Sequence, residues 1–156
     1  MAARRSIRRR IGAGVGIAAL VLTAACGGSD SGDDASSGDP IKIAFIGTTE
    51  SEITSVPASA SATQARVDAI NADGGINGRK IELTVCNDKG DANEASVCAR
   101  QAAQEGAVAV IGGISLQGDA VTSGLTQAGI VFTGYRPISP GEYNAEVGYP
   151  LAAGAA

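Results

Sequence analysis

The sequence predicts an α/β fold in which an open parallel sheet carries helices on both faces. Along residues 41–133, short and nearly continuous apolar runs alternate with longer segments of helical character. Such apolar runs are typical of strands buried on both faces, because a half-exposed strand would alternate apolar and polar residues. A repeated succession of strand, helix and strand requires right-handed crossovers, which make the strands parallel.

The expected strands are short apolar runs. The first run, IKIAFIG, is apolar except for one lysine, and an Asn77-Gly78 turn signal precedes the second. The tail, Gly134–Ala156, contains three of the five prolines and shows no clear period, so no further element is expected there. The expected strands are Ile41–Gly47, Ile81–Cys86, Ala107–Ile111 and Ile130–Thr133.

Helices are expected between these strands, and capping signals mark their ends. Pro57 suits the first turn of the first helix. Asp91, followed three residues later by Glu94, has the pattern of a capping box at the start of the second helix. Gly129 marks the end of the third helix. The expected ranges are Ala58–Ala72, residues 92–105 and Gly118–Gln127.

The predicted topology also predicts a ligand site. In an open parallel sheet, ligands bind beyond the carboxyl ends of the strands, at the point where strand order reverses. With strand order 2-1-3-4, this point lies between the loops that follow the first and third strands. The expected lining comes from three loops: Thr48, Thr49, Glu50 and Ser51, then Gly113–Gln117, and then Gly134–Pro137.

Some residues in these loops allow more than one interpretation. Gly112-Gly113 could hold an anion on backbone amides, or could only form a tight turn between strand and helix. Neither glycine pattern of nucleotide-binding proteins, G-x-G-x-x-G or G-x-x-x-x-G-K-[ST], is present. Glu50, Glu52 and Asp119 could act as acid–base carboxylates, but no fixed spacing pairs them, and solvated loop charges are the simpler interpretation.

The amino terminus has the organisation of an export signal. MAARRSIRRR carries five arginines and no acid, and the apolar run Ile11–Ala25 follows it. This run is too short to cross a bilayer core of about 30 Å, which takes about 20 helical residues. Cys26 then ends LTAAC, which resembles the box in bacterial lipoproteins whose cysteine is acylated, although Leu22 lies one place further out than usual. A plain secretory signal is the alternative.

This organisation divides the chain into three regions. Residues 1–25 are the expected signal peptide, and residues 26–40 are a linker that is almost entirely Gly, Ser and Asp after Cys26. Such a linker cannot bury apolar surface, so we expect it to stay flexible and to hold a folded domain away from a membrane. Residues 41–156 are the expected α/β domain. We therefore expect an extracytoplasmic chain, in the periplasm or on the outer face, that a lipid on Cys26 anchors to the cell membrane.

Charge and composition exclude several classes of function. Cleavage before Cys26 would remove five of the twelve basic residues and none of the sixteen acidic ones, which leaves a net charge of −9. Nucleic acid is therefore not an expected partner, because phosphate binding needs a basic face. The chain contains no histidine, which excludes His-based catalytic triads and His-ligated metals. We expect no enzyme activity, no metal and no cofactor.

Two cysteines remain once Cys26 is assigned to the lipid, and both lie in an oxidising compartment. Cys86 ends a strand pattern, and Cys98 lies on the face of the next helix that should pack over that strand. A disulfide between them would stabilise the fold by about 3 kcal/mol. Metal binding would need two more ligands, and a redox pair is more typical of C-x-x-C. Two unpaired buried thiols are the main alternative.

Four stretches of the chain resemble one known family. IKIAFIG, DAINADGGINGRKIEL, NDKGDANEASVCARQ and AVAVIGG are similar to the amino-terminal lobe of the type I periplasmic solute-binding proteins that serve branched-chain amino acid ABC transporters. The GGINGRKIEL block is the most specific, and the resemblance extends from about Ile41 to Thr133. It implies a lipid-anchored receptor that binds an amino acid or similar small polar solute and delivers it to ABC permease subunits. In this family two α/β lobes close on the solute like a hinged clamp.

The resemblance also implies site residues. In the family, the first lobe holds the solute's carboxylate and ammonium groups through hydroxyl and backbone groups after the third and fourth strands. Here these positions are Ser115 and Tyr135–Pro137, with Thr48 and Thr49 beside them. The stretch ISLQGD keeps a hydroxyl only at Ser115, and GYRP replaces a stretch of small residues. Arg136 could pair with a carboxylate or could simply be exposed, so solutes other than branched-chain amino acids fit as well.

Length is the largest departure from the family. A complete receptor has two lobes and is much longer, so we expect this chain to be a fragment that binds solute weakly or not at all by itself. A lipid-anchored sensor or docking module built on the same lobe is the alternative function, because a fold does not determine a function. The lack of histidine and of a G-x-S-x-G motif disfavours a flavodoxin-like or hydrolase-type enzyme.

Overall fold

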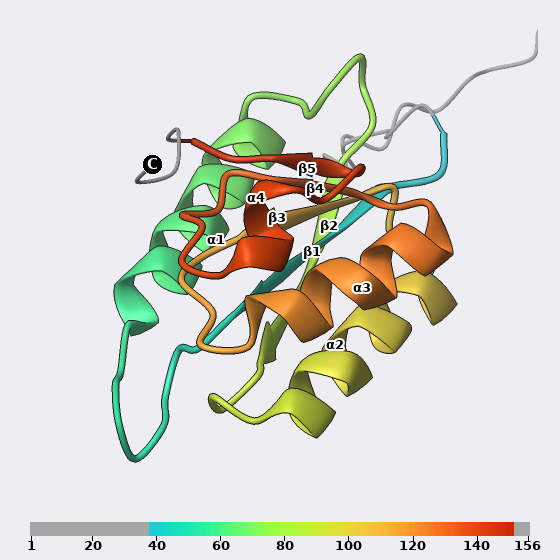
Figure 1. Cartoon of the computed structure of the whole chain (residues 1–156). Helices are drawn as coiled ribbons and strands as arrows, with labels where there is room; N and C mark the ends of the chain where they lie inside the picture. Colours follow the sequence, from blue (N-terminus) through green and yellow to red (C-terminus); the bar gives the residue numbers. More distant parts are fainter. Residues whose placement is uncertain (1–37, 152–156) are drawn as a thin grey trace, which may run out of the picture. The chain divides into compact units, whose positions relative to one another are not determined.

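The strands within residues 38–151 run parallel in one sheet, in the order β2-β1-β3-β4-β5. The structure is a computed structural model that describes residues 38–151. Helices connect the strands (Figure 1). In chain order the elements are β1 (Ile41–Gly47), α1 (Pro57–Ala72), β2 (Ile81–Asn87), α2 (Ala92–Gln104), β3 (Ala109–Gly112), α3 (Gly118–Ala128), β4 (Val131–Thr133), α4 (Pro140–Tyr143) and β5 (Gly148–Tyr149).

The predicted fold class is confirmed, and so is the order of the first four strands. The expectation for the tail is wrong, because a short helix and a fifth strand follow β4. β5 pairs with β4 through two residue pairs, which is too short for a hydrophobic period to show in the sequence. α4 did have a signal, since Ser139 and Glu142 form a capping box around Pro140.

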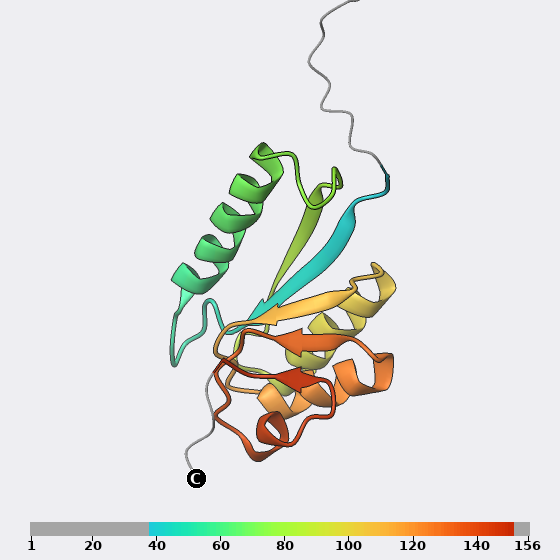
Figure 2. The ribbon, with the colours of Figure 1, turned by 90° about the horizontal axis from the view of Figure 1, so that it is seen from above.

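Helices cover both faces of the sheet (Figure 2). α2 and α3 lie side by side over one face, and α1 lies over the other face, against β1 and β2. The main hydrophobic core lies between the sheet and the α2–α3 pair, where the rings of Phe132 and Tyr135 stack with centroids 4.1 Å apart. The other core side chains are small or aliphatic: Ala44, Ile46, Ala95, Cys98, Ala99, Ala102, Ala107, Val110, Val121, Leu125 and Ile130.

The face that carries α1 is covered less completely. Val67 is the one buried residue of this helix, which lies beside β1 and β2 and leaves β3 to β5 open (Figure 2). An apolar hollow of about 340 Å³ opens between α1 and the sheet, with Ile43, Ile81 and Ile111 in its lining. Val131 lies on the same face, because it shares a register row with Ala109, and it is 40% exposed.

The capping signals explain where the helices begin and end. α1 starts at Pro57, as expected. The Asp91 side chain accepts hydrogen bonds from the backbone amides of Asn93 and Glu94, which confirms Asp91 as the cap of α2. The reciprocal half of the predicted capping box does not form, because the Asp91 amide donates to the Asp88 carbonyl and not to Glu94. Gly129 ends α3 in the left-handed conformation, with φ of 66°, which a side chain would disfavour.

The predicted disulfide is confirmed. Cys86 and Cys98 are bonded, and their Cα atoms lie 5.7 Å apart. The bond joins the end of β2 to the face of α2 that packs on the sheet, where Cys98 is buried. It therefore fixes α2 to β2 close to the point where the strand ends and its loop begins.

Part of the sequence-based interpretation lies outside the described residues. The expected signal peptide, Cys26 and the linker as far as residue 37 belong to this part, so they stay predictions. Among residues 38–151, no helix has both the length and the apolar character that crossing a membrane requires.

Candidate functional site

The loops that follow β1, β2, β3 and β4 gather at one edge of the sheet, where the parallel strands end (Figure 2). We call this edge the rim, and it consists of residues 48–56, 88–90, 113–117 and 134–139. Backbone hydrogen bonds connect its loops directly. The Thr48 amide donates to the Ile114 carbonyl at 2.8 Å, and the Arg136 amide donates to the Gly113 carbonyl at 3.5 Å. The rim is therefore the edge at which the sequence predicted a ligand site.

Asp88 connects three loops of the rim and is completely buried. Its Oδ1 accepts a hydrogen bond from the Thr48 hydroxyl at 2.5 Å, and its Oδ2 accepts one from the Ser115 hydroxyl at 2.5 Å. Each hydroxyl oxygen in turn accepts a backbone amide. Thr48 accepts the amide of Leu116 at 3.1 Å, and Ser115 accepts that of Gln117 at 3.0 Å.

Asn87, the last residue of β2, makes a second set of hydrogen bonds nearer to solvent. Its Oδ1 accepts the backbone amides of Thr49 and Lys89, each at 3.0 Å, and that of Glu50 at 3.4 Å. Its Nδ2 donates to the Glu50 carbonyl at 2.9 Å. The side chain thus holds the start of the β1–α1 loop against the β2–α2 loop.

Thr48 and Ser115, two of the residues predicted to bind the ligand, lie behind the rim surface. Thr48 is 1% exposed and Ser115 is 2% exposed. Their hydroxyl hydrogens are donated to Asp88, and their hydroxyl oxygens already accept backbone amides. In this conformation both side chains hold the loops together. Whether they also contact a ligand stays a prediction.

Thr49 and Arg136 present free polar groups at the rim. Within the part of the chain that the structure describes, no hydrogen bond or ion pair uses the Thr49 hydroxyl or the Arg136 guanidinium. Thr49 is half-buried, and Arg136 is exposed between two buried neighbours, Tyr135 and Pro137. The backbone at Arg136 is therefore fixed while its charged group faces solvent.

Tyr135, the fifth predicted site residue, is completely buried. Its ring stacks on Phe132, and its hydroxyl donates to the Glu142 carbonyl oxygen at 2.8 Å. Burial raises the pKa of the Tyr135 phenol above its ordinary value, and the nearby Glu142 carboxylate adds to the rise. The ring therefore supports the loop that carries Arg136, and its contact with a ligand stays a prediction.

Glu142 fixes the same loop from the other side. Its Oε2 accepts the backbone amides of Ile138 and Ser139, at 2.8 Å and 3.0 Å, together with the Ser139 hydroxyl. The carboxyl group lies against the first residue of α3, Gly118, where a Cβ atom would come within 2.0 Å of Glu142 Cδ. Only glycine at this position leaves room for the buried carboxyl group.

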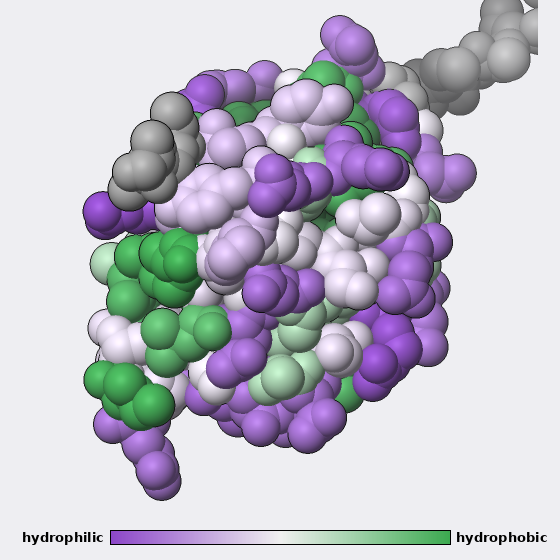
Figure 3. Space-filling model, viewed as in Figure 1, coloured by the Kyte–Doolittle hydropathy of each residue, from purple (hydrophilic) through white to green (hydrophobic). Residues whose placement is uncertain are grey.

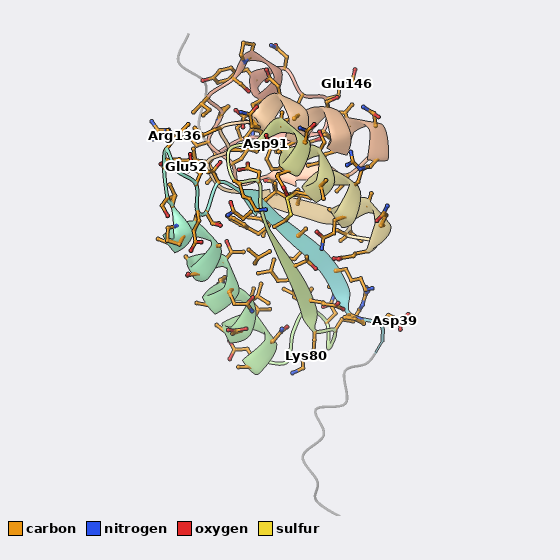
Figure 4. The ribbon with its side chains drawn as sticks, turned by 90° about the horizontal axis from the view of Figure 1, so that it is seen from below. Asp39, Glu52, Lys80, Asp91, Arg136 and Glu146 are labelled. Atoms are coloured by element: carbon orange, nitrogen blue, oxygen red, sulfur yellow. A yellow bond between two sulfur atoms is a disulfide. The ribbon has the colours of Figure 1, made fainter. Side chains whose placement is uncertain are left out.

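Charged and apolar side chains share the open surface of the rim. Arg136 and Glu52 lie at this end of the molecule, and Asp39 and Lys80 lie at the opposite end of the strands (Figure 4). Ile53 is 84% exposed and lies in the first rim loop. Ile138, in the fourth loop, is 48% exposed, and Figure 3 shows apolar surface gathered at this side. A small molecule at the rim would meet both kinds of group.

Among the described residues, no cluster of three or more His, Cys, Asp or Glu side chains is placed to hold a metal ion. The acidic side chains near the rim are separated or engaged otherwise. Lys89 pairs with Glu94 at 3.4 Å on the exposed surface, and Asp91 caps α2.

The sheet topology and the gathered loops define an open α/β lobe, and in sheets of this kind ligands bind at the carboxyl edge. The chain belongs to the periplasmic binding protein family, whose sequence model matches residues 40–153. This match confirms the resemblance found in the sequence. A search among proteins of curated function found no match.

Solved structures of the same family contain this lobe. It is similar to the branched-chain amino acid transporter substrate-binding protein LivJ from Streptococcus pneumoniae, solved with isoleucine, at 26% identity and a TM-score of 0.61. That match covers 71% of this chain and 33% of LivJ. A periplasmic binding protein type 1 from Bordetella pertussis matches at 26% identity, with a TM-score of 0.51, over 61% of this chain and 26% of its own.

A third structure supports the fold alone. The substrate-binding periplasmic protein from Ralstonia solanacearum shares 21% identity with this chain, at a TM-score of 0.59. The match covers 70% of this chain and 33% of that protein. The matched part of this chain thus spans about a third of the length of LivJ and of the Ralstonia solanacearum protein.

The sequence reasoning missed the residues that organise the rim. Asn87 and Asp88 directly follow an expected strand, which was the available signal, because the residue after a parallel strand lies at the carboxyl edge. Glu142 also had a signal in the S-x-x-E pattern from Ser139. None of the three was predicted as a site residue.

Proposed function

We propose that this chain is the amino-terminal part of a solute-binding protein that works outside the cytoplasm with an ABC importer. Membership of the periplasmic binding protein family supports this general role. The similar lobe of a receptor solved with isoleucine supports an amino acid, or a similar small polar solute, as the ligand class. The observation that carries the proposal is the rim, where four loops gather at the carboxyl edge of a parallel sheet.

The free groups of the rim suit a small solute that carries a carboxylate and some apolar surface. The Arg136 guanidinium can pair with a carboxylate through two parallel hydrogen bonds. The Thr49 hydroxyl can donate or accept one more. Ile53 and Ile138, both exposed, can contact apolar atoms of the solute. This combination supports an amino acid-like solute without favouring a branched side chain over an aromatic or an amide one.

A single lobe supplies only one wall of such a site. In the proposed receptor a second lobe closes over the solute, and this closure removes water from both walls. We therefore expect the chain alone to bind with a dissociation constant of about 1 mM or weaker, which corresponds to at most about 4 kcal/mol of binding free energy. Solute delivery to ABC permease subunits is proposed for the whole receptor.

The proposed receptor is held at the membrane by a lipid on Cys26. The LTAAC box and the Gly/Ser/Asp-rich stretch that follows it support this part of the proposal. A flexible tether of this composition would let the lobe move close to a permease while it stays near the membrane surface. Extracytoplasmic location also fits the Cys86–Cys98 disulfide, because such bonds persist in oxidising compartments.

Titration of the chain with a panel of L-amino acids, followed by calorimetry and by NMR, tests the proposal. We expect saturable binding of one or a few members at about millimolar concentration and no response to their D-enantiomers. If no member of the panel binds at about tens of millimolar, the proposal that the rim of this lobe holds an amino acid by itself is wrong. Micromolar affinity would contradict only the idea that one lobe is insufficient.

A further inference from the structure

Two adjacent residues at the end of β2 make contacts in three separate loops. Asp88 bonds Thr48, which follows β1, and Ser115, which follows β3. Asn87 bonds the backbone of Thr49 and Glu50. These partners lie 27 to 40 positions away along the chain, so the contacts join parts of the rim that no local element connects.

The buried carboxylate of Asp88 needs a structural explanation. A charged group that is removed from water costs several kcal/mol unless hydrogen bonds compensate it, as a general rule. Among the described residues, the partners of Asp88 are two hydroxyl groups and the Gly90 amide at 2.9 Å, and none of them is a cation. An apolar residue would fill the same space at less cost but could not join the loops.

The two side chains that donate hydrogen bonds to Asp88 also connect it to the backbone of the rim. Thr48 and Ser115 each accept an amide from the β3–α3 loop, from Leu116 and Gln117 respectively. Displacement of the carboxylate would therefore release two backbone groups at the start of α3, the place where the rim faces solvent. The position of this backbone depends on Asp88 although the carboxylate itself cannot reach a solute.

The base of this arrangement is rigid. Cys86 directly precedes Asn87, and its disulfide fixes the end of β2 to the buried Cys98 of α2. The Asn87 side chain then holds the β1–α1 loop through both its oxygen and its nitrogen. The disulfide-bonded end of β2 carries both Asn87 and Asp88. Together these two side chains define where the first and third rim loops lie relative to each other.

We propose that Asn87 and Asp88 are positioning residues for solute binding: they hold the β1–α1 and β3–α3 loops in the relative position that a solute needs. This inference rests on the proposed function, because it assumes that the rim binds a solute. The two can still be tested separately. The two side chains act through Thr49 and through the backbone of residues 115–117.

The test compares Asp88→Asn with Asp91→Asn in the full chain. Both changes replace a carboxylate by an amide of the same shape, three positions apart in the same loop. Asp91 is exposed and caps α2, where asparagine is an equally good cap. Amide hydrogen exchange and NMR titration with the best-binding L-amino acid of the panel are measured for the wild-type chain and for both variants.

For Asp88→Asn, we expect the Leu116 and Gln117 amides to exchange at least about tenfold faster, because neither hydroxyl keeps a charged acceptor and one of them faces an NH2 group that cannot accept its hydrogen. Amides in the centre of α3 should keep their protection, which shows that the lobe is still folded. We expect affinity for the amino acid to fall by about tenfold or more. Asp91→Asn should change neither quantity.

Asn87→Ala keeps the inference testable if Asp88→Asn does not fold. This variant should speed exchange at Thr49 and Glu50, lower the affinity, and leave Leu116 and Gln117 protected. Unchanged exchange in the loops, or faster exchange with unchanged affinity, would overturn the inference. If the wild-type chain binds no amino acid, the proposed function fails, and the exchange data alone still decide whether the two residues hold the loops.

Discussion

Removal of the Cys86–Cys98 bond should lower the stability of the lobe without changing its fold. The bond closes a loop with a sequence separation of 12. In the chain-entropy model, a loop of this length restricts the unfolded chain enough to stabilise the folded state by about 3 kcal/mol. With a urea dependence of about 1–3 kcal/mol per molar for a domain of this size, the unfolding midpoint should fall by roughly 1–3 M.

Urea unfolding followed by circular dichroism measures this loss. The wild-type chain is compared with and without reductant, next to the Cys86→Ala/Cys98→Ala variant. Reductant should destabilise the wild-type chain and leave the double variant unchanged. The difference between the reduced wild-type chain and the variant isolates the packing lost with the buried sulfur of Cys98. A drop on reduction of less than about 1 kcal/mol would refute the loop-closure reasoning.

Three further outcomes are expected. Arg136→Ala should weaken amino acid binding by about tenfold, while Arg100→Ala, an exposed change on α2, should not; equal affinities would remove Arg136 from the site. The pKa of the Tyr135 phenol is higher in the folded chain than in the unfolded chain. The neutral phenol therefore stabilises the fold fully at pH values below its unfolded pKa, and this stabilisation is lost as the pH rises through its folded pKa. Unfolding free energies from about pH 8 to about pH 11 should therefore fall more for wild type than for Tyr135→Phe, and parallel curves would contradict this. Cys26→Ala should move the protein from the membrane fraction to the soluble fraction; if the variant stays with the membrane, no lipid on Cys26 is needed for anchoring.

The elements that the sequence predicted well are those with a strong local signal. Ile41–Gly47 is one such case, because a nearly continuous apolar run of this length is typical of a strand that is buried on both faces. The role of Asp91 as a helix cap was equally predictable, since its capping partners are its near neighbours along the chain. The Cys86–Cys98 bond followed from the predicted packing of a helix over the preceding strand.

The elements that the sequence did not predict depend on distant partners. β5 is held by pairing with β4 and leaves no period of its own. Asp88 looks like any loop carboxylate in the sequence, because Thr48 and Ser115 lie 40 and 27 positions away. For the same reason the buried positions of the Thr48 and Ser115 hydroxyls were not foreseen. A hydroxyl after a strand can face a ligand or a neighbouring loop, and only the packing of the loops decides which.

Backbone amide NMR shifts, recorded while an L-amino acid is added to the chain, test most directly whether solute binds at the rim. Binding at the rim predicts that the shifting amides cluster at Thr49, Leu116 and Arg136, whose loops lie at the carboxyl edge of the sheet. The amides of α2, which covers one face of the sheet, should keep their chemical shifts. Shifts confined to that helix, or to the hollow beside α1, would contradict it.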